Sequence, residues 1–199
     1  MASRTRERLI DVARQLFARK GLENTTMNDI ATASDRGRRT IYTYFRTKDE
    51  IYQAVIEDEA NRILGEIEAR LAQADTPQQK LKALMDYRMQ LAVKTPHSYE
   101  VWLKSLFNRD LKRAAGVRSK VTARLYQMTE NIVNEGIASG DFIPSQARRL
   151  PAMLTLLIRG SDTSVVRDAE YGQTALWLGE CIDFIIQGVV NPGKSEPTS

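Results

Sequence analysis

The segment from Thr25 to Lys48 constrains the fold of this chain more than any other part of the sequence. Thr26 precedes Asp29 by three residues, and Thr47 precedes Glu50 by the same spacing. In each pair, the threonine hydroxyl can accept a hydrogen bond from a backbone N–H that a helix start leaves unpaired, and the carboxylate favours the positive helix end. The segment therefore predicts one helix that begins near Thr26 and another that begins near Thr47.

Between these two starts, the sequence predicts a tight turn and a further short helix. Residues 34–37 read Ser-Asp-Arg-Gly, which is turn chemistry. The segment that follows is crowded with side chains that can contact phosphates or base edges, namely Arg38, Arg39, Thr40, Tyr42, Thr43 and Tyr44. Two short helices joined by a tight turn, the second with a basic leading edge, are typical of a helix-turn-helix DNA-binding motif.

Positive charge is concentrated in the same part of the chain. Residues 1–49 hold 11 Lys and Arg against 6 Asp and Glu, a net charge of +5, whereas residues 50–199 hold 18 against 19, a net charge of −1. Phosphate binding requires a basic region of this kind. A solvated charged face is the alternative interpretation. We prefer DNA binding because the charge coincides with the helix-turn-helix pattern.

The composition predicts a soluble cytoplasmic protein with a hydrophobic core. With 199 residues, of which 42% are hydrophobic, the chain is long enough to bury such a core. Its single cysteine, Cys181, excludes an internal disulfide and a multi-cysteine zinc site, which suits a reducing cytoplasm. The N-terminus has no apolar signal core, and no stretch approaches the roughly 18 apolar residues of a membrane span. We therefore expect no membrane partner.

The sequence contains no group of residues typical of an enzyme. His97 is the only histidine, so a histidine-rich metal site or a catalytic histidine pair has little to draw on. Neither a phosphate-binding glycine loop nor a dinucleotide-binding fingerprint is present. We expect no catalytic activity, no cofactor and no bound metal.

Helical periodicity extends along the whole chain. The apolar residues of the first predicted helix recur on one face, and Gly21 ends it. We expect this face to form a small core with the two helix-turn-helix segments, built from Leu9, Val12, Ala13, Leu16, Phe17, Ile30, Ala31, Ile41 and Phe45. Later helices are predicted at about residues 47–74, 76–95, 99–107, 111–139, 145–160 and 171–188. Pro151 is expected to kink its helix or to mark the true start.

Several motifs in the first quarter of the chain occur together in one known family. They are Phe17 to Gly21 at the end of the first helix, the pair Thr25-Thr26, the run Asp29-Ile30-Ala31, and Thr40-Ile41-Tyr42 with Tyr44-Phe45 and Lys48. On these motifs, residues 6–55 resemble the TetR family of bacterial transcriptional repressors. The resemblance implies an all-α protein of about nine helices. It would have a three-helix helix-turn-helix headpiece and a larger antiparallel helical domain that binds an effector and dimerises.

We accordingly predict two domains and a tail. Residues 1–46 are expected to form the DNA-binding domain and residues 47–190 the ligand-binding and dimerisation domain. Residues 191–199, rich in Pro, Ser and Gly, are expected to be disordered.

The resemblance also implies roles for individual residues of the headpiece. Four match the family's base-facing positions: Asn28, Arg38, Arg39 and Thr43. Five match its phosphate-facing positions: Thr26, Thr40, Tyr42, Tyr44 and Lys48. This division agrees with their chemistry, because arginine can bind guanine O6 and N7 together, whereas hydroxyl groups and lysine suit phosphates.

The chain departs from the family pattern at the turn. Asp35, Arg36 and Gly37 stand where the family usually has Gly, an aliphatic residue and then Ser or Thr. Asp tolerates the left-handed backbone conformation that Gly provides, and Gly can serve as an N-cap. Arg36 loses the aliphatic packing contact unless its stem covers the core and its head reaches solvent or DNA.

The larger domain carries candidates for two further sites. Large side chains that could line an apolar effector pocket are Tyr87, Trp102, Phe107 and Tyr126, with ordinary core packing as the alternative. The last two predicted helices contain small residues that allow close helix packing and are expected to form the dimer interface through Leu154, Ile158, Leu178, Ile182 and Ile185. These residues could instead close the core of the monomer.

Together these features predict a homodimeric transcriptional repressor that an unknown small-molecule effector releases from a near-palindromic double-stranded DNA operator. In the alternative, the same headpiece binds DNA and the larger domain binds a protein partner in place of a small ligand. A third possibility, an enzyme or carrier that merely contains such helices, has no motif in its favour.

Overall fold

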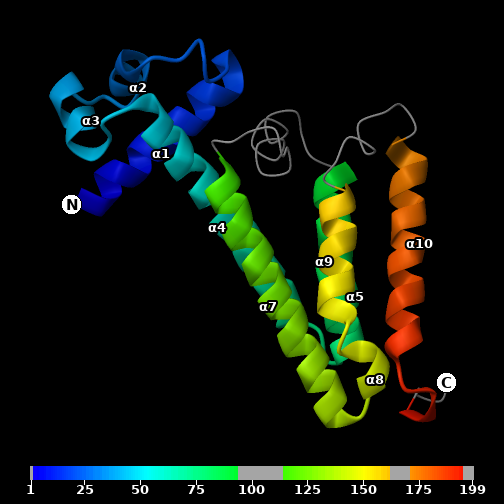
Figure 1. Cartoon of the computed structure of the whole chain (residues 1–199). Helices are drawn as coiled ribbons and strands as arrows, with labels where there is room; N and C mark the ends of the chain where they lie inside the picture. Colours follow the sequence, from blue (N-terminus) through cyan, green and yellow to red (C-terminus); the bar gives the residue numbers. More distant parts are fainter. Residues whose placement is uncertain (1, 94–113, 162–170, 195–199) are drawn as a thin grey trace. The chain divides into compact units, whose positions relative to one another are not determined.

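A computed structural model describes residues 2–93, 114–161 and 171–194 of the chain. Over these ranges the protein is built of nine α-helices and one short 3-10 helix, with no strand (Figure 1). The α-helices are α1 (Ala2–Lys20), α2 (Met27–Ala33), α3 (Arg38–Tyr44), α4 (Lys48–Leu71), α5 (Pro77–Val93), α7 (Ala115–Ser139), α8 (Pro144–Ala147), α9 (Leu150–Ser161) and α10 (Tyr171–Val189). The predicted all-α fold class is confirmed.

The described residues divide into two compact units. The first comprises residues 2–62 and 114–117, and the second comprises residues 63–93, 118–161 and 171–194. Helix α4 is continuous through the boundary at residues 62 and 63. The domain boundary predicted after residue 46 stays a prediction.

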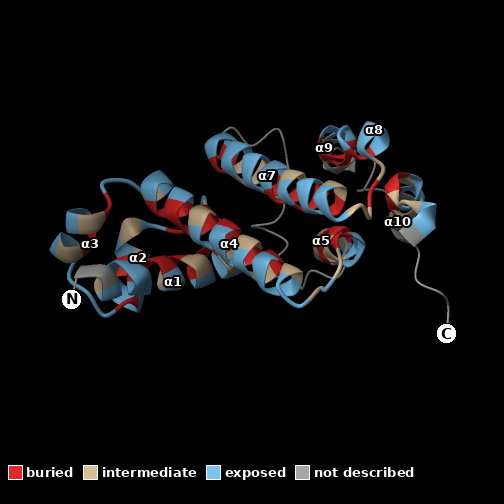
Figure 2. Ribbon diagram, turned by 90° about the horizontal axis from the view of Figure 1, so that it is seen from below, coloured by how far each residue is buried: buried red, intermediate tan, exposed pale blue. Residues whose placement is uncertain are grey.

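The core of the first unit lies where α1, α2, α3 and the start of α4 meet. One stripe of α1 is buried there, and each of the two short helices adds an isoleucine, Ile30 and Ile41, that is fully buried (Figure 2). The Phe17 ring meets the Tyr52 ring edge-on, with 5.9 Å between their centroids. Of the nine predicted core residues, eight are buried and Val12 is half-buried. This core fixes the outward faces of α2 and α3.

A cluster of charged side chains joins α1 to α4 within the first unit. Arg14 of α1 bonds Asp11 at 2.7 Å and also bonds Asp58 of α4. Glu59 is only 2% exposed and pairs with Arg62. Glu59 also lies 3.9 Å from Arg14. Because a buried carboxylate without a cation would be costly, its pairs with Arg62 and Arg14 are a condition for placing Glu59 in the interior.

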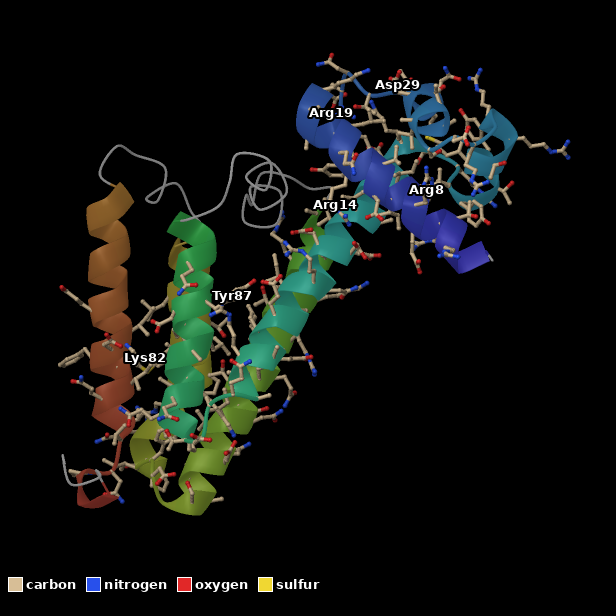
Figure 3. The ribbon with its side chains drawn as sticks, turned by 180° about the vertical axis from the view of Figure 1, so that it is seen from behind. Arg8, Arg14, Arg19, Asp29, Lys82 and Tyr87 are labelled. Carbon is tan, nitrogen blue, oxygen red and sulfur yellow. The ribbon has the colours of Figure 1, made fainter. Side chains whose placement is uncertain are left out.

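The second unit is a helical bundle in which α5 packs against α10. Apolar residues of α5, α7, α9 and α10 fill its interior. At its surface, Lys80 of α5 bonds both oxygens of Glu135 on α7, at 2.6 and 2.8 Å. Lys82 of α5 bonds Asp183 of α10 at 2.8 Å (Figure 3), and this hydrogen bond raises the pKa of the lysine.

The helix start predicted at residue 76 is confirmed, whereas the helix predicted over residues 145–160 is divided. Thr76 accepts a hydrogen bond from the Gln79 N–H, and the Gln79 side chain accepts from the Thr76 N–H, at the start of α5. The predicted helix over residues 145–160 is two helices, α8 and α9. Pro151 lies in the first turn of α9 and so marks its start, because a helix leaves the N–H groups of this turn unpaired.

The prediction of a disordered tail from Asn191 does not hold for its first four residues. The Asn191 N–H donates to the Asp141 carbonyl at 2.8 Å, and its side-chain amide donates to the Gly140 carbonyl. Residues Pro192–Lys194 form the 3-10 helix η3. The two bonds of Asn191 join it to the turn between α7 and α8. Residues 195–199 lie outside the described ranges.

That turn is closed by a tight contact between a glycine and an aromatic ring. The Phe142 side chain is 1% exposed and lies over Gly136 of α7. A Cβ atom placed on Gly136 would come within 2.2 to 2.8 Å of three ring atoms. The Phe142 N–H also donates to the Gly136 carbonyl at 2.9 Å. The close approach therefore requires glycine at this position.

Gly136→Ala is expected to destabilise the protein by about 1–3 kcal/mol, because the added methyl group displaces the Phe142 ring. Thermal unfolding should show a Tm lower by roughly 2–12 °C. Gly65→Ala is the matched control: it lies in α4 with no neighbour within 4 Å of the new Cβ. This control should be neutral or up to about 1 kcal/mol more stable. Equal Tm values for the two variants would contradict the packing argument.

Candidate nucleic-acid interface

Helix α2 begins with a complete capping box. The Asp29 N–H donates to the Thr26 hydroxyl oxygen at 3.1 Å, and the Asp29 carboxylate accepts from the Thr26 N–H at 2.9 Å. The bond from the Thr26 N–H, and then the bond from its hydroxyl, hold the pKa of Asp29 below the ordinary carboxyl value. Figure 3 marks Asp29 on this helix. The helix start predicted at Thr26 is confirmed.

The turn after α2 depends on a left-handed residue. Asp35 has φ +55°, the only positive φ at a non-glycine position in the described ranges. Its N–H donates to the Thr32 carbonyl at 3.1 Å, and the Arg36 N–H donates to the Ala31 carbonyl at 3.0 Å. These two bonds form a Schellman motif, with aspartate in the place that glycine usually takes. The prediction that Asp35 tolerates this conformation is confirmed.

Helix α1 holds the end of α2 directly. Ser34 is completely buried, and its hydroxyl donates to the Ala31 carbonyl at 2.9 Å. Arg8 of α1 donates from Nε to the Ser34 carbonyl at 3.2 Å. A cationic donor at a helix C-terminus is favourable because the last carbonyls carry the negative end of the helix dipole. Sequence reasoning did not identify Arg8, whose partner is 26 residues away.

Helix α3 presents a basic outer face. Arg38, Arg39, Tyr42 and Thr43 are exposed, whereas Thr40 and Tyr44 are half-buried. Residues 36–46 include four arginines and no carboxylate. In the described part of the chain, Arg36, Arg38 and Arg39 have no ion pair and no side-chain hydrogen bond, and all three are exposed. Their guanidinium groups are therefore available to an anionic partner.

Other predicted DNA-contacting groups are already engaged within the protein. The Thr26 hydroxyl serves the capping box, and the Thr43 hydroxyl donates to the Arg39 carbonyl at 3.1 Å. The Lys48 ammonium group donates to the Leu22 carbonyl at 2.7 Å and to the Glu23 carbonyl at 3.3 Å. Asn28 is exposed on α2. The first unit thus contains all nine predicted DNA-binding residues. Thr26 caps α2, Asn28 lies on α2, Lys48 begins α4, and the other six lie on α3.

An acidic hollow lies beside the C-terminal end of α3. It has a volume of about 460 Å³, and its lining includes Asp49, Glu50 and Glu57 of α4. The Arg6 guanidinium stacks over the Phe45 ring at its edge, 5.3 Å from the ring centroid. Three carboxylates disfavour a phosphate. The basic surface therefore ends where α4 begins.

The predicted effector-pocket residues are only partly described. Tyr87 of α5 is buried, its hydroxyl donates to the Glu66 carboxylate, and the Arg70 guanidinium lies 4.5 Å from its ring centroid. Tyr126 of α7 is 39% exposed. Trp102 and Phe107 lie outside the described residues. The two described tyrosines are thus in different environments, one interior and one at the surface.

The predicted dimer residues also differ in their surroundings. Leu154 and Ile182 are 1% and 6% exposed, so both already pack in the interior of the second unit. Ile185 is half-buried, and the side chains of Ile158 and Leu178 lie outside the described set. The exposed apolar side chains of α9 and α10 are instead Met153, Leu156 and Phe184, at 44%, 69% and 78%. Periodicity identified the apolar stripe but could not tell which part of it neighbouring helices cover.

The described ranges hold neither a membrane-spanning helix nor a metal-binding cluster. No helix there combines the length and the apolar character that crossing a membrane requires. No three His, Cys, Asp or Glu side chains there gather as a metal site would need, and His97 falls outside those ranges.

Known bacterial regulators are similar to this chain, first of all over its helix-turn-helix region. Residues 9–55 match the family model described as bacterial regulatory proteins, tetR family. Over 141 residues, the chain is 29% identical to the HTH-type transcriptional repressor KstR2 of Mycolicibacterium smegmatis, covering 70% of this chain and 68% of that protein. Two further curated regulators align over only 39% and 50% of their own lengths.

Solved structures share the whole fold. A transcriptional regulator from Saccharomonospora viridis, in complex with choline, superposes with a TM-score of 0.70 at 23% identity, over 95% of this chain and 99% of that one. The regulator FadR from Bacillus subtilis, in complex with stearoyl-CoA, gives 0.66 at 18% identity, over 92% and 98%. The matched amino-terminal residues are those that build the helix-turn-helix surface described above. The helix-turn-helix region of this chain is thus similar to the TetR family of bacterial regulatory proteins, and solved regulators share the fold of the rest.

Proposed function

We propose that this protein is a homodimeric transcriptional repressor that binds a near-palindromic operator through α3 and that a small molecule releases from the DNA. The observation that carries the proposal is the outer face of α3, where exposed arginines have no partner in the described part of the chain. The match of residues 9–55 to a family of bacterial regulatory proteins, and the similarity to a transcriptional repressor over 141 residues, support it. Because its partner is bacterial DNA, the protein would act in the cytoplasm.

In this proposal α3 enters the major groove. Arg38 and Arg39 lie in its first turn, where a recognition helix contacts base edges, and each can bind guanine O6 and N7. The Thr43 hydroxyl already donates its proton to the Arg39 carbonyl, and we propose that its methyl group contacts a thymine methyl. Asn28 is the fourth base-facing candidate.

The groups around this helix fix its register on phosphates. Thr40, Tyr42 and Tyr44 supply hydroxyl groups, and Thr26 marks the start of α2, where backbone N–H groups suit phosphate oxygens. Arg36 joins this set because its guanidinium is exposed and unpartnered just before α3.

A dimer would present two such helices to successive half-sites, about 34–36 Å apart. The surface of the second unit supports this step. Of the five exposed large hydrophobic residues in the described ranges, three lie on α9 and α10, namely Met153, Leu156 and Phe184. Exposed apolar groups of this size are typical of interaction surfaces. We therefore propose these three, with Ile185, as the dimer contacts in place of Leu154 and Ile182.

The effector is proposed to be a small apolar or amphipathic molecule bound in the helical body. The neighbours in complex with choline and with stearoyl-CoA indicate that this fold accommodates chemically different ligands, so neither ligand is transferred to this chain. Tyr87 with Glu66 and Arg70 provides polar groups that could orient a ligand, and Trp102, Phe107 and Tyr126 stay candidates for its apolar wall. Helix α4 begins at the headpiece and would carry the ligand's effect to it.

Selection of bound duplexes from a random DNA pool should yield a two-fold symmetric sequence. Against that sequence, Arg38→Ala is expected to cost about 1–3 kcal/mol and to relax the preference at one base pair in each half-site. Arg148→Ala, which removes an exposed arginine directly after α8, should bind like the parent. If no sequence is enriched, or if Arg38→Ala keeps the full preference, α3 is not the reading helix.

Phe184→Lys is expected to shift the protein from dimer to monomer, because it places a charge in an apolar interface. Sedimentation velocity over a concentration series would measure the change. Gln146→Lys, at an exposed position of α8, adds the same charge and should leave the dimer intact. A parent protein that sediments as a monomer would contradict the proposed assembly.

A ligand of the helical body should raise the Tm and dissociate the operator complex. At a ligand concentration 100 times its Kd, the stabilisation is about 2.7 kcal/mol, or roughly 5–11 °C for a chain of this length. Quaternary ammonium compounds and long-chain acyl-CoA esters are the first probes to test. A screen in which ligands stabilise the protein but never release DNA would favour the protein-partner alternative.

A further inference from the structure

The ammonium group of Lys48 is held inside the first unit. Lys48 is the first residue of α4, and its Nζ donates to the carbonyl oxygens of Leu22 at 2.7 Å and Glu23 at 3.3 Å. Both carbonyls belong to the loop between α1 and α2, which lies 25 to 26 residues earlier in the chain. A lysine ammonium has three donors, so two of them are already used by the protein.

Other hydrogen bonds of this loop are local, including one from the Thr25 N–H to the Leu22 carbonyl at 3.3 Å. Gly21 ends α1 with φ +80°, and its carbonyl accepts from the buried Thr25 hydroxyl at 2.8 Å. The Asn24 side chain donates to the Lys20 carbonyl at 3.1 Å. The carbonyls of residues 22 and 23 are therefore the part of the loop that a more distant cation holds. Directly after the loop, Thr26 caps α2.

We propose that Lys48 is a positioning residue that ties the start of α4 to the α1–α2 loop and so sets the position of α2 for DNA reading. The inference rests on the proposed DNA-binding function. It replaces the expectation that Lys48 acts through a phosphate.

Through these two hydrogen bonds, α4 is joined to the α1–α2 loop in addition to its connection to α3 along the chain. A displacement of the first turn of α4 moves the ammonium group, which moves the carbonyls of residues 22 and 23 and with them the cap of α2. The bond to the Leu22 carbonyl, at 2.7 Å, has the short length typical of a charged donor, so it transmits a small movement.

Lys48→Met keeps the side-chain stem and removes the ammonium group. We expect the ratio of affinity for the selected operator over scrambled DNA to fall by about tenfold, while the slope of log K against log salt stays that of the parent. Hydrogen exchange should become faster across residues 22–29 and stay unchanged at Ile41. Arg19→Met removes an equal charge from the last turn of α1, where the arginine is exposed, and should change none of these readings.

Lys48→Arg provides the rescue, since it keeps a cationic donor and should restore most of the operator preference and exchange protection. A salt slope lower by about one unit in Lys48→Met, with exchange unchanged, would mean a phosphate contact and would overturn the proposal. Unchanged preference and exchange would overturn it as well. Hydrogen exchange is measured without DNA and therefore tests the Lys48 bonds independently of DNA binding. A parent protein that selects no operator would overturn the proposed function, and hydrogen exchange would still decide whether Lys48 holds the α1–α2 loop.

Discussion

The orientation of α3 depends on the backbone conformation of one residue, Asp35. Its φ of +55° reverses the chain after α2, and two hydrogen bonds to the carbonyls of Thr32 and Ala31 close the reversal. The conformation is disfavoured for most L-residues, and a short polar side chain tolerates it best after glycine. Ile30 and Ile41, buried on either side of the turn, then fix both helices on the core. Because Ile41 of α3 is buried in this core, Arg38 and Arg39 lie on the exposed side of the helix.

Charge sets the limits of the surface that this reversal creates. Residues 36–46 carry only positive charges, and the first turn of α4 carries Asp49 and Glu50. These carboxylates suit a helix N-terminus and disfavour phosphate. At the other end of the headpiece, Arg14 is surrounded by carboxylates of α1 and α4, including the buried Glu59. Arginine is thus used in two ways here, paired where helices must be held together and unpaired where DNA is proposed to bind.

Sequence reasoning identified the parts of the site that depend on neighbours in the chain. The Thr26–Asp29 cap and the turn at Asp35 involve residues at most five apart, so the local pattern contains the whole interaction. It did not identify the partners of Lys48 or Arg8, which lie 25 or more residues away. It also chose Leu154 and Ile182 for a surface although both are interior, because an apolar stripe does not reveal how many helices cover it.

The sequence by itself determined most of the helices, their caps and the resemblance of the headpiece to a known family, because each follows from short-range periodicity, turn chemistry and contiguous motifs. Only the tertiary structure decided which cations are free. The sequence shows only that four side chains are cationic, namely those of Arg36, Arg38, Lys48 and Arg14. The fold leaves Arg36 and Arg38 exposed. It brings Lys48 to two carbonyl groups and places Arg14 among carboxylates. The availability of a charge depends on which distant groups the folded chain places beside it.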